Sequence, residues 1–329
     1  MRHTGSTPRA YDAGFIGLGD LGGAIARRML DHGVRLTVFD PNPEAVRLTA
    51  SRGAIPAATS RAVGATCKIV FLCLPGPDVL REVGLGRYGL VHGMSAGDIV
   101  IEMSTSGPDA VREVGAVLAE RGIRMIDAAV GKGPWAAEQG DLTLMLGGDE
   151  ETLDEVDHLL QVVASRLYRC GPLGAGQVVK LVNNLASCTN LAIAVEAIAL
   201  AQRCGADLSV VTEVLPQTAA DSWHLRHTVI DKALGRRDFD PVFKLKLARK
   251  DLGLALNMAE RVGLAAGCAR GALEWHDRGM AAGLGDHDQC AIMLTLGDND
   301  RTSTQASGES DGKATDASPV GGGPGGRGR

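Results

Sequence analysis

Residues 14–30 read GFIGLGDLGGAIARRML, and this stretch decides the fold. It begins as a short apolar run typical of a buried strand and ends with the apolar spacing of a helix. Gly17, Gly19 and Gly22 stand at the junction in the spacing GxGxxG. In this context the first glycine permits a tight turn, the second allows a pyrophosphate to approach the backbone, and the third lets the helix pack on the strand. The stretch therefore predicts a strand, turn and helix that bind the phosphates of a dinucleotide at the helix N-terminus.

Short apolar runs and helical patterns alternate from Ala13 to about Gly171. The strand-like runs are AGFIG, VRLTVFD, CKIVFLCL, GDIVIEM, IRMIDAAV, DLTLML and SRLYRC, and helical patterns such as AIARRMLDHG lie between several of them. This alternation predicts an α/β Rossmann-like domain with a mostly parallel sheet and helices on both faces.

The second half of the chain has a different texture. From Gly174 to about Leu296 it gives one long helix, from about Gln177 to Arg203, followed by shorter helices. We therefore expect residues 13–173 to form the NAD-binding domain and residues 174–296 an all-α domain for substrate binding and dimerisation. Residues 1–12 are expected to be flexible. Residues 297–329 are rich in small polar residues, so a disordered tail is expected there.

Composition narrows the class of protein. The chain has 329 residues and a net charge of -5, and aromatic residues are only 3%. It lacks the concentrated basic residues and stacking aromatics of a nucleic-acid binder. The first dozen residues contain no apolar signal core, and the apolar stretch Leu181–Leu200 is interrupted by polar side chains. The seven cysteines are scattered along the chain, which favours reduced thiols over disulfide bonds. We therefore expect a cytoplasmic protein without nucleic-acid or membrane partners.

Asp40 ends the second strand-like run, about twenty residues after the glycines, where an acidic side chain can accept hydrogen bonds from ribose hydroxyls. Its charge would repel a 2'-phosphate, and the following Pro41 and Asn42 supply no cation. NAD is therefore expected as the cofactor, with NADP less expected. Alternatively, Asp40 is only a turn or N-cap residue before Pro41.

Lys180 lies in the predicted long helix, one turn before Asn184 and two turns before Ser187. These side chains share one helix face. The next charged residue is Glu196, so we expect Lys180 to lie in a cleft, where desolvation lowers the pKa of a lysine and allows it to give and accept a proton. The alternative is a solvated lysine, with Asn183 and Asn184 only linking or capping helices.

From Gly14 to about Ala291 the chain resembles the β-hydroxyacid dehydrogenases, the family of 3-hydroxyisobutyrate dehydrogenase. The matching blocks are GFIGLGDLGG, FLCLPGP, IEMSTSGP, DAAVGKG through GDLTLMLGG, GAGQVVKLVNN and KDLGLAL. The resemblance implies that Lys180 is the catalytic lysine. It implies that the cofactor is lined by Asp20, Leu21, Asp40, Leu74, Pro75, Thr105 and Lys250, and that the substrate is faced by Ser104, Gly131, Lys132, Gly133, Asn183, Asn184 and Ser187.

The resemblance also bears on the type of reaction and on the role of Lys250. The similar imine reductases replace the catalytic lysine, so retention of Lys180 favours carbonyl and alcohol chemistry over C=N reduction. For Lys250, an ordinary ion pair with Asp251 is the alternative to cofactor contact.

The segment DAAVGKG, residues 127–133, departs from the DAPVSGG pattern of the family because Gly131 stands where serine is usual and Lys132 where glycine is usual. A branch, the 3-sulfolactaldehyde reductases, has VGR at this place, with the arginine on the sulfonate. Lys132 is a point charge that can bind a sulfonate, carboxylate or phosphate with less shape selection. The alternative is that Lys132 faces solvent and backbone alone holds the substrate.

These features together predict an NAD-dependent oxidoreductase for a small anionic hydroxy compound or semialdehyde, with 3-sulfolactaldehyde as the sharpest candidate and 3-hydroxyisobutyrate as the alternative. His224 and His227 have metal-compatible spacing but no evident third ligand, so no metal is expected. Trp135 is expected either to line the pocket or to pack between domains. The long apolar helix favours a homodimer or homotetramer. A nucleotide-binding module without activity is the alternative of another class.

Overall fold

The computed structural model describes residues 12–296. The disordered tail predicted for residues 297–329 lies outside the described residues, and so does the flexible N-terminus predicted for residues 1–12, except for Asp12.

The glycine-rich stretch opens an eight-stranded sheet of order β3-β2-β1-β4-β5-β6-β7-β8. The strands are β1 (Asp12–Ile16), β2 (Arg35–Phe39), β3 (Ile55–Pro56), β4 (Ile69–Leu72), β5 (Ile99–Glu102), β6 (Arg124–Gly131), β7 (Leu142–Gly147) and β8 (Ala164–Gly171). β6 and β7 pair antiparallel, whereas the other neighbours pair parallel. The predicted mostly parallel sheet is confirmed, and β3 was missed because two residues are too short to give a periodic signal.

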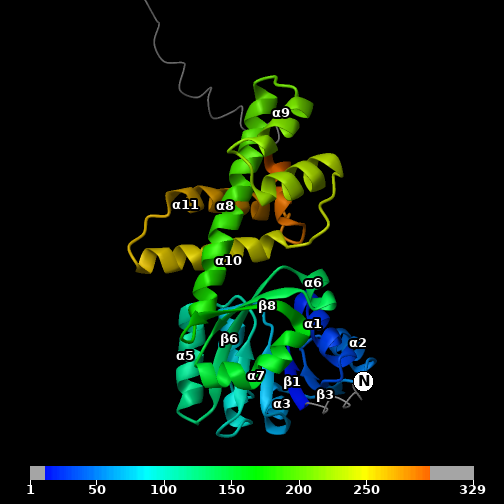
Figure 1. The fold of residues 1–329 in the computed structure, drawn as a ribbon, viewed down its shortest axis with the longest axis vertical. Coiled ribbons are helices and arrows are strands. Elements are labelled where there is room, and N and C mark those ends of the chain that lie inside the picture. The colour runs from blue at the N-terminus through cyan, green and yellow to red at the C-terminus, as the bar shows by residue number, and fades with distance from the viewer. Residues whose placement is uncertain (1–11, 297–329) are drawn as a thin grey trace, which may run out of the picture. The chain divides into compact units, whose positions relative to one another are not determined.

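Helices cover both faces of the sheet (Figure 1). They are α1 (Asp20–Asp31), α2 (Pro43–Ala50), α3 (Ser60–Thr66), α4 (Pro77–Leu85), the short η1 (Leu90–His92), α5 (Pro108–Ala119), α6 (Pro134–Gln139) and α7 (Glu150–Val163). Phe15 packs in the core beneath α1 and α7, whereas its neighbour Ile16 packs in the core with α4 and α5. Residues 13–16 of β1 are buried between the two layers of helices, and their sequence AGFI is accordingly an unbroken apolar run.

The second half is helical, as the sequence predicts. It contains α8 (Ala175–Arg203), α9 (Leu208–Val214), η2 (Leu215–Gln217), the π-helix η3 (His224–Gly235), α10 (Leu245–Arg261), α11 (Gly267–Ala281) and η4 (Gln289–Leu296). α8 contacts β6, β7 and β8 near its start and packs against η3, α10 and α11 farther along (Figure 1). Residues 12–295 belong to one compact unit, so the domain boundary predicted between Leu173 and Gly174 stays a prediction.

α8 is long and apolar enough to cross a membrane by length and composition alone. Of its most apolar window, 44% is buried inside the protein. A core helix of a soluble protein passes the same test, so the helix is weak evidence for a membrane span.

Two glycines in helices should respond in opposite ways to replacement by alanine. A Cβ on Gly22 would lie 2.0 Å from the carbonyl oxygen of Gly17, whereas one on Gly253 in α10 would meet no described atom within 4 Å. We expect Gly22→Ala to destabilise the fold by about 1–3 kcal/mol through overpacking and Gly253→Ala to stabilise it by about 0.5–1 kcal/mol through helix propensity. Urea unfolding measures both, and a Gly22→Ala protein as stable as the parent would contradict the packing.

Candidate active site

The turn between β1 and α1 leaves room for a phosphate. Gly17 has φ +93°, and a Cβ there would lie 2.2 Å from the carbonyl oxygen of Cys73, so no other residue fits without a shift. Gly19 is exposed, and a Cβ on it would meet no described atom within 4 Å. Gly19 is also the N-cap of α1, and no side chain of the described residues caps that helix. The first N–H groups of α1 therefore have no side-chain cap from Gly19, which suits the pyrophosphate of a dinucleotide.

Asp40 follows β2 beside this turn. Its Oδ2 accepts a hydrogen bond from the N–H of Leu18 at 2.6 Å, and its Oδ1 accepts one from the N–H of Asn42 at 2.7 Å. The carboxylate is thus fixed against the glycine turn while it also closes a local turn. Each oxygen keeps a further lone pair that a ribose hydroxyl can use.

The turns after β4 and β5 meet α10. The N–H of Leu74 donates to Oγ of Ser104 at 2.6 Å, and Ser104 is 4% exposed. Lys250 on α10 donates from Nζ to the carbonyl oxygen of Thr105 at 2.7 Å. Pro75, beside Leu74, is exposed. The structure therefore gathers the residues predicted to line the cofactor at adjacent strand ends, but it places the Ser104 hydroxyl inside the protein, so its predicted contact with substrate stays a prediction.

Lys180 is half-buried on α8, and its Nζ makes no hydrogen bond or ion pair within residues 12–296. One turn later Asn184 is 5% exposed and donates from Nδ2 to Oδ2 of Asp251 at 2.6 Å. Asn183 is exposed and donates to Oδ1 of Asn184 at 2.9 Å. Asp251 also lies 3.0 Å from Nζ of Lys250. Lys250 thus makes the ion pair given by its alternative reading and reaches the β5 turn at the same time.

The electrostatics around Lys180 combine burial with two nearby charges. Burial lowers the pKa of Lys180, the carboxylate of Asp251 opposes this, and the ammonium of Lys250 adds to it. Asp251 is itself only 3% exposed. A lysine whose pKa is depressed toward the working pH can both give and accept a proton.

Ser187 continues the face of Lys180 and is bonded to the π-helix. Its Oγ lies 2.6 Å from Nε2 of His224, whose Nδ1 lies 3.0 Å from Oγ1 of Thr228. Burial lowers the pKa of His224 to about 4, so the ring is neutral at pH 7. The histidine that had metal-compatible spacing is therefore a hydrogen-bond partner of Ser187, and within residues 12–296 no group of three or more His, Cys, Asp or Glu side chains is arranged to hold a metal.

Lys132 has a partner that its sequence position did not reveal. It follows β6 with φ 69°, and its Nζ lies 2.5 Å from Oδ2 of Asp141. Asp141 also accepts from Oγ of Ser165 at 2.5 Å, and its hydrogen bond with Lys132 lowers the pKa of the carboxyl. The pair is partly exposed, so it is screened by water. A substrate anion at Lys132 would have to compete with Asp141.

The glycines beside Lys132 serve the backbone. Gly131 is the last residue of β6 and pairs with Thr143 of β7, and Gly133 is the N-cap of α6. Trp135, just inside α6, is 52% exposed, so it fills no core within residues 12–296.

Sequence reasoning missed residues that hold the site together. Asp127 on β6 is fully buried and accepts hydrogen bonds from the N–H groups of Gly174 at 2.6 Å and Gln177 at 2.8 Å, which caps the start of α8. The sequence does contain a sign of both residues. Asp127 is an acidic residue inside an apolar strand pattern, and Asp251 directly follows Lys250 in the motif KDLGLAL.

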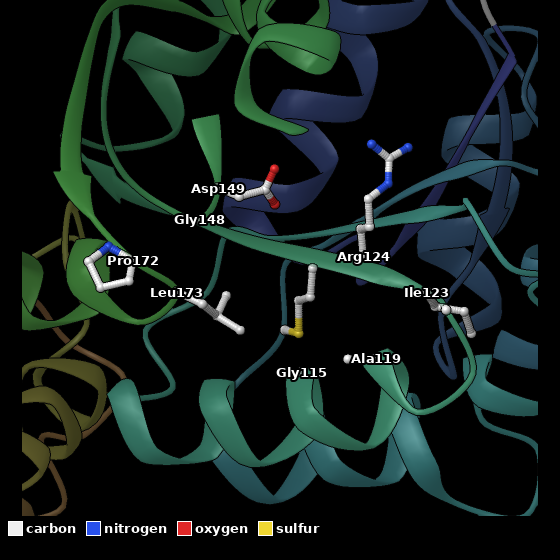
Figure 2. Close-up of a pocket in the computed structure, with 10 residues that line it drawn as sticks. Gly115, Ala119, Ile123, Arg124, Gly148, Asp149, Pro172 and Leu173 are labelled. Carbon is white, nitrogen blue, oxygen red and sulfur yellow. The ribbon is translucent and has the colours of Figure 1, made fainter. Parts of the chain in front are cut away.

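A surface hollow lies between α5, the start of β6 and the turn that precedes α8 (Figure 2). It is lined mainly by small and apolar residues, including Gly115, Ala119 and Leu173, with Arg124 and Asp149 at one side. None of the predicted cofactor, substrate or catalytic residues lines it.

Comparisons with known proteins agree with this arrangement. Residues 12–171 match the family model described as the NAD binding domain of 6-phosphogluconate dehydrogenase. Residues 174–296 match the model described as NAD-binding of NADP-dependent 3-hydroxyisobutyrate dehydrogenase.

The matches with individual relatives cover nearly the whole length of each relative. The chain is 32% identical to 2-(hydroxymethyl)glutarate dehydrogenase of Eubacterium barkeri over 87% of this chain and 94% of that one. It is 34% identical to 3-sulfolactaldehyde reductase of Escherichia coli over 85% and 93%. The solved structure of 3-hydroxyisobutyrate dehydrogenase of Mycobacterium tuberculosis with L-serine has a TM-score of 0.80 and 28% identity to this chain, and the match covers 88% of this chain and 100% of that one. The chain belongs to the β-hydroxyacid dehydrogenase family, whose members are nicotinamide-dependent oxidoreductases that act on CH–OH groups.

Proposed function

We propose that the chain transfers a hydride between NAD and a small hydroxy compound or semialdehyde that carries an acidic group, with Lys180 as the general acid and base. The observation that carries the proposal is the half-buried position of Lys180, which lies on the same helix face as Asn184 and close enough to Asp251 and Lys250 for their charges to act on it. A lysine on a solvent-facing helix surface would be mostly exposed, and burial would not lower its pKa.

The roles of the residues follow from their positions. The turn containing Gly17 and Gly19 holds the pyrophosphate and Asp40 holds the ribose, while the bound dinucleotide supplies or accepts the hydride. In reduction Lys180 gives a proton to the carbonyl oxygen, and in oxidation it takes the proton of the hydroxyl. Asp251 stabilises the ammonium form and keeps Asn184 oriented toward the same face.

The preference for NAD over NADP rests on Asp40. A 2'-phosphate would meet a carboxylate that two backbone N–H groups already hold in place. The two negative groups would repel each other, and the segment Asp40–Asn42 contains no cation to offset this repulsion.

For the substrate we favour a sulfonated aldehyde such as 3-sulfolactaldehyde, because Lys132 offers a cation beside two glycines and a relative at 34% identity carries that name. A second candidate, 3-hydroxyisobutyrate or a related hydroxy acid, is favoured by the ion pair of Lys132 with Asp141, which neutralises the loop before substrate arrives. In that case backbone N–H groups hold the carboxylate.

Exposed apolar side chains on two helices bear on how the chain associates with other copies. α8 and α9 expose apolar side chains, among them Val182, Ile193, Leu200 and Val210, and pairing with a second copy would cover such side chains. We propose a cytoplasmic homodimer or homotetramer without nucleic-acid or membrane partners. The competing class is a nucleotide-binding module without turnover.

Replacing Lys180 by methionine tests the catalytic assignment. General acid–base catalysis contributes about 10²- to 10⁴-fold, so Lys180→Met should lose at least about 100-fold in kcat for aldehyde reduction while NADH still binds. Steady-state assays across matched sulfonate, carboxylate and phosphate substrates measure the loss, and NADH fluorescence measures binding. Lys246→Met removes an exposed ion pair with Asp286 and serves as the control. Unchanged turnover in Lys180→Met would contradict the assignment, and a parent protein that binds NADH but turns over no substrate would favour the binding module.

The pair of Lys132 and Asp141 distinguishes the two substrate candidates. If Lys132 binds the sulfonate, Lys132→Ala should raise KM for 3-sulfolactaldehyde by about 10-fold or more, whereas Asp141→Asn should lower it because the ammonium is freed. Activity on uncharged short aldehydes should change little in either variant. Equal losses on charged and uncharged substrates would rule out an anion site at Lys132.

A further inference from the structure

Gln177 lies in the first turn of α8, three residues before Lys180, and is fully buried. On a helix, residues three apart lie on the same side. Gln177 and Lys180 therefore extend from one short rigid segment of backbone.

The side chain of Gln177 bonds to a single turn, the segment 104–107 between β5 and α5. Its Oε1 accepts from the N–H groups of Ser106 and Gly107, each at 3.0 Å, and its Nε2 donates to the carbonyl oxygen of Ser104 at 2.8 Å. The amide thus serves both an acceptor and two donors of one buried turn. The carbonyl oxygen of Thr105, in the same turn, accepts from Nζ of Lys250.

Neither asparagine nor an ionised glutamate can make this set of bonds unchanged. Asparagine is one methylene shorter, and a glutamate carboxylate can accept but not donate, so it would place an oxygen against the carbonyl of Ser104. A buried polar group without its partner costs free energy. The bonds therefore fix the distance between α8 and the turn.

We propose that Gln177 is a positioning residue that sets Lys180 against the turn 104–107, where the cofactor and the reacting oxygen meet. The inference rests on the proposed function, because it matters only if Lys180 transfers the proton. The side chain of Gln177 is fully buried, so it acts through the turn and not by contact with a ligand. It acts by holding α8 in register with the turn that also receives Lys250.

The surroundings of Gln177 make a charge change informative. Asp127 accepts from its backbone N–H, and Glu102, at the end of β5, accepts from Oγ of Ser106 at 3.0 Å. Both carboxyls are buried, and burial raises the pKa of Asp127 to about 6 and that of Glu102 to about 7. Lys180 lies one turn along α8, where Asp251 and Lys250 of α10 act on it, and Arg112 of α5 acts on Asp127. A carboxyl placed at position 177 would share this buried, acidic setting and would hold its proton near neutral pH.

Gln177→Glu is the test, with Gln202→Glu, at an exposed position near the end of the same helix, as the matched control. While the new carboxyl is protonated it can donate to Ser104 as the amide does. We expect turnover close to the parent at low pH and a loss of about 10- to 100-fold at high pH, with NADH affinity within about threefold of the parent. Gln177→Asn should lose turnover at every pH.

Steady-state kcat and KM are measured across pH on the full chain, with circular dichroism at each pH to measure the folded fraction. A Gln177→Glu pH profile equal to that of Gln202→Glu would overturn the proposal, and so would a loss of turnover that only follows unfolding. Lys180→Met separates the two ideas. If it remains active, the proposed function fails, whereas if it is inactive while both Gln177 variants match the control, only the positioning role fails.

Discussion

The site depends on how the first turn of α8 is fixed to the turn after β5 and to Asp127 in the middle of β6. Asp127 accepts two N–H groups at the start of the helix, and the Gln177 amide bonds three groups of the turn after β5. All these atoms are buried, so breaking one bond leaves a polar group without water. Lys180, Asn184 and Ser187 extend from the helix beyond this anchor. Their positions relative to the cofactor turns therefore follow from a capped helix terminus and one amide.

Burial gives the same kind of charge different properties in two places. Lys180 is half-buried, and the partial loss of water around it depresses its pKa, while the neighbouring Asp251 opposes the shift. Lys132 pairs with Asp141 where both side chains are partly exposed, and such pairs are screened and weak. The first lysine suits proton transfer, and the second suits exchange of one anion for another. The proposed mechanism uses this difference, since turnover depends on Lys180 and substrate choice on Lys132.

Much of this fold could be predicted because strands, helices and tight turns are determined largely by residues close together in the sequence. The glycine spacing around Gly17, the apolar runs of the long strands and the length of α8 all appear where the sequence placed them. The partners of the site could not be read in this way. Asp141 reaches Lys132 across α6, and Gln177 reaches the turn 104–107 across about seventy residues of chain. Neither contact leaves a periodic pattern in the sequence, although Asp141 and Gln177 are both polar residues beside apolar segments.

The central claim is that burial and Asp251 together set the proton affinity of Lys180. The pH dependence of aldehyde reduction by the parent and by Asp251→Asn tests it most directly, because reduction needs the protonated lysine and is lost as pH rises through its pKa. We predict an inflection below the ordinary lysine pKa of 10.5 in the parent. In the variant it should move to lower pH, since the stabilising charge is gone while an asparagine oxygen can still accept from Asn184. An inflection at the ordinary value, or one that moves upward in Asp251→Asn, would contradict the account.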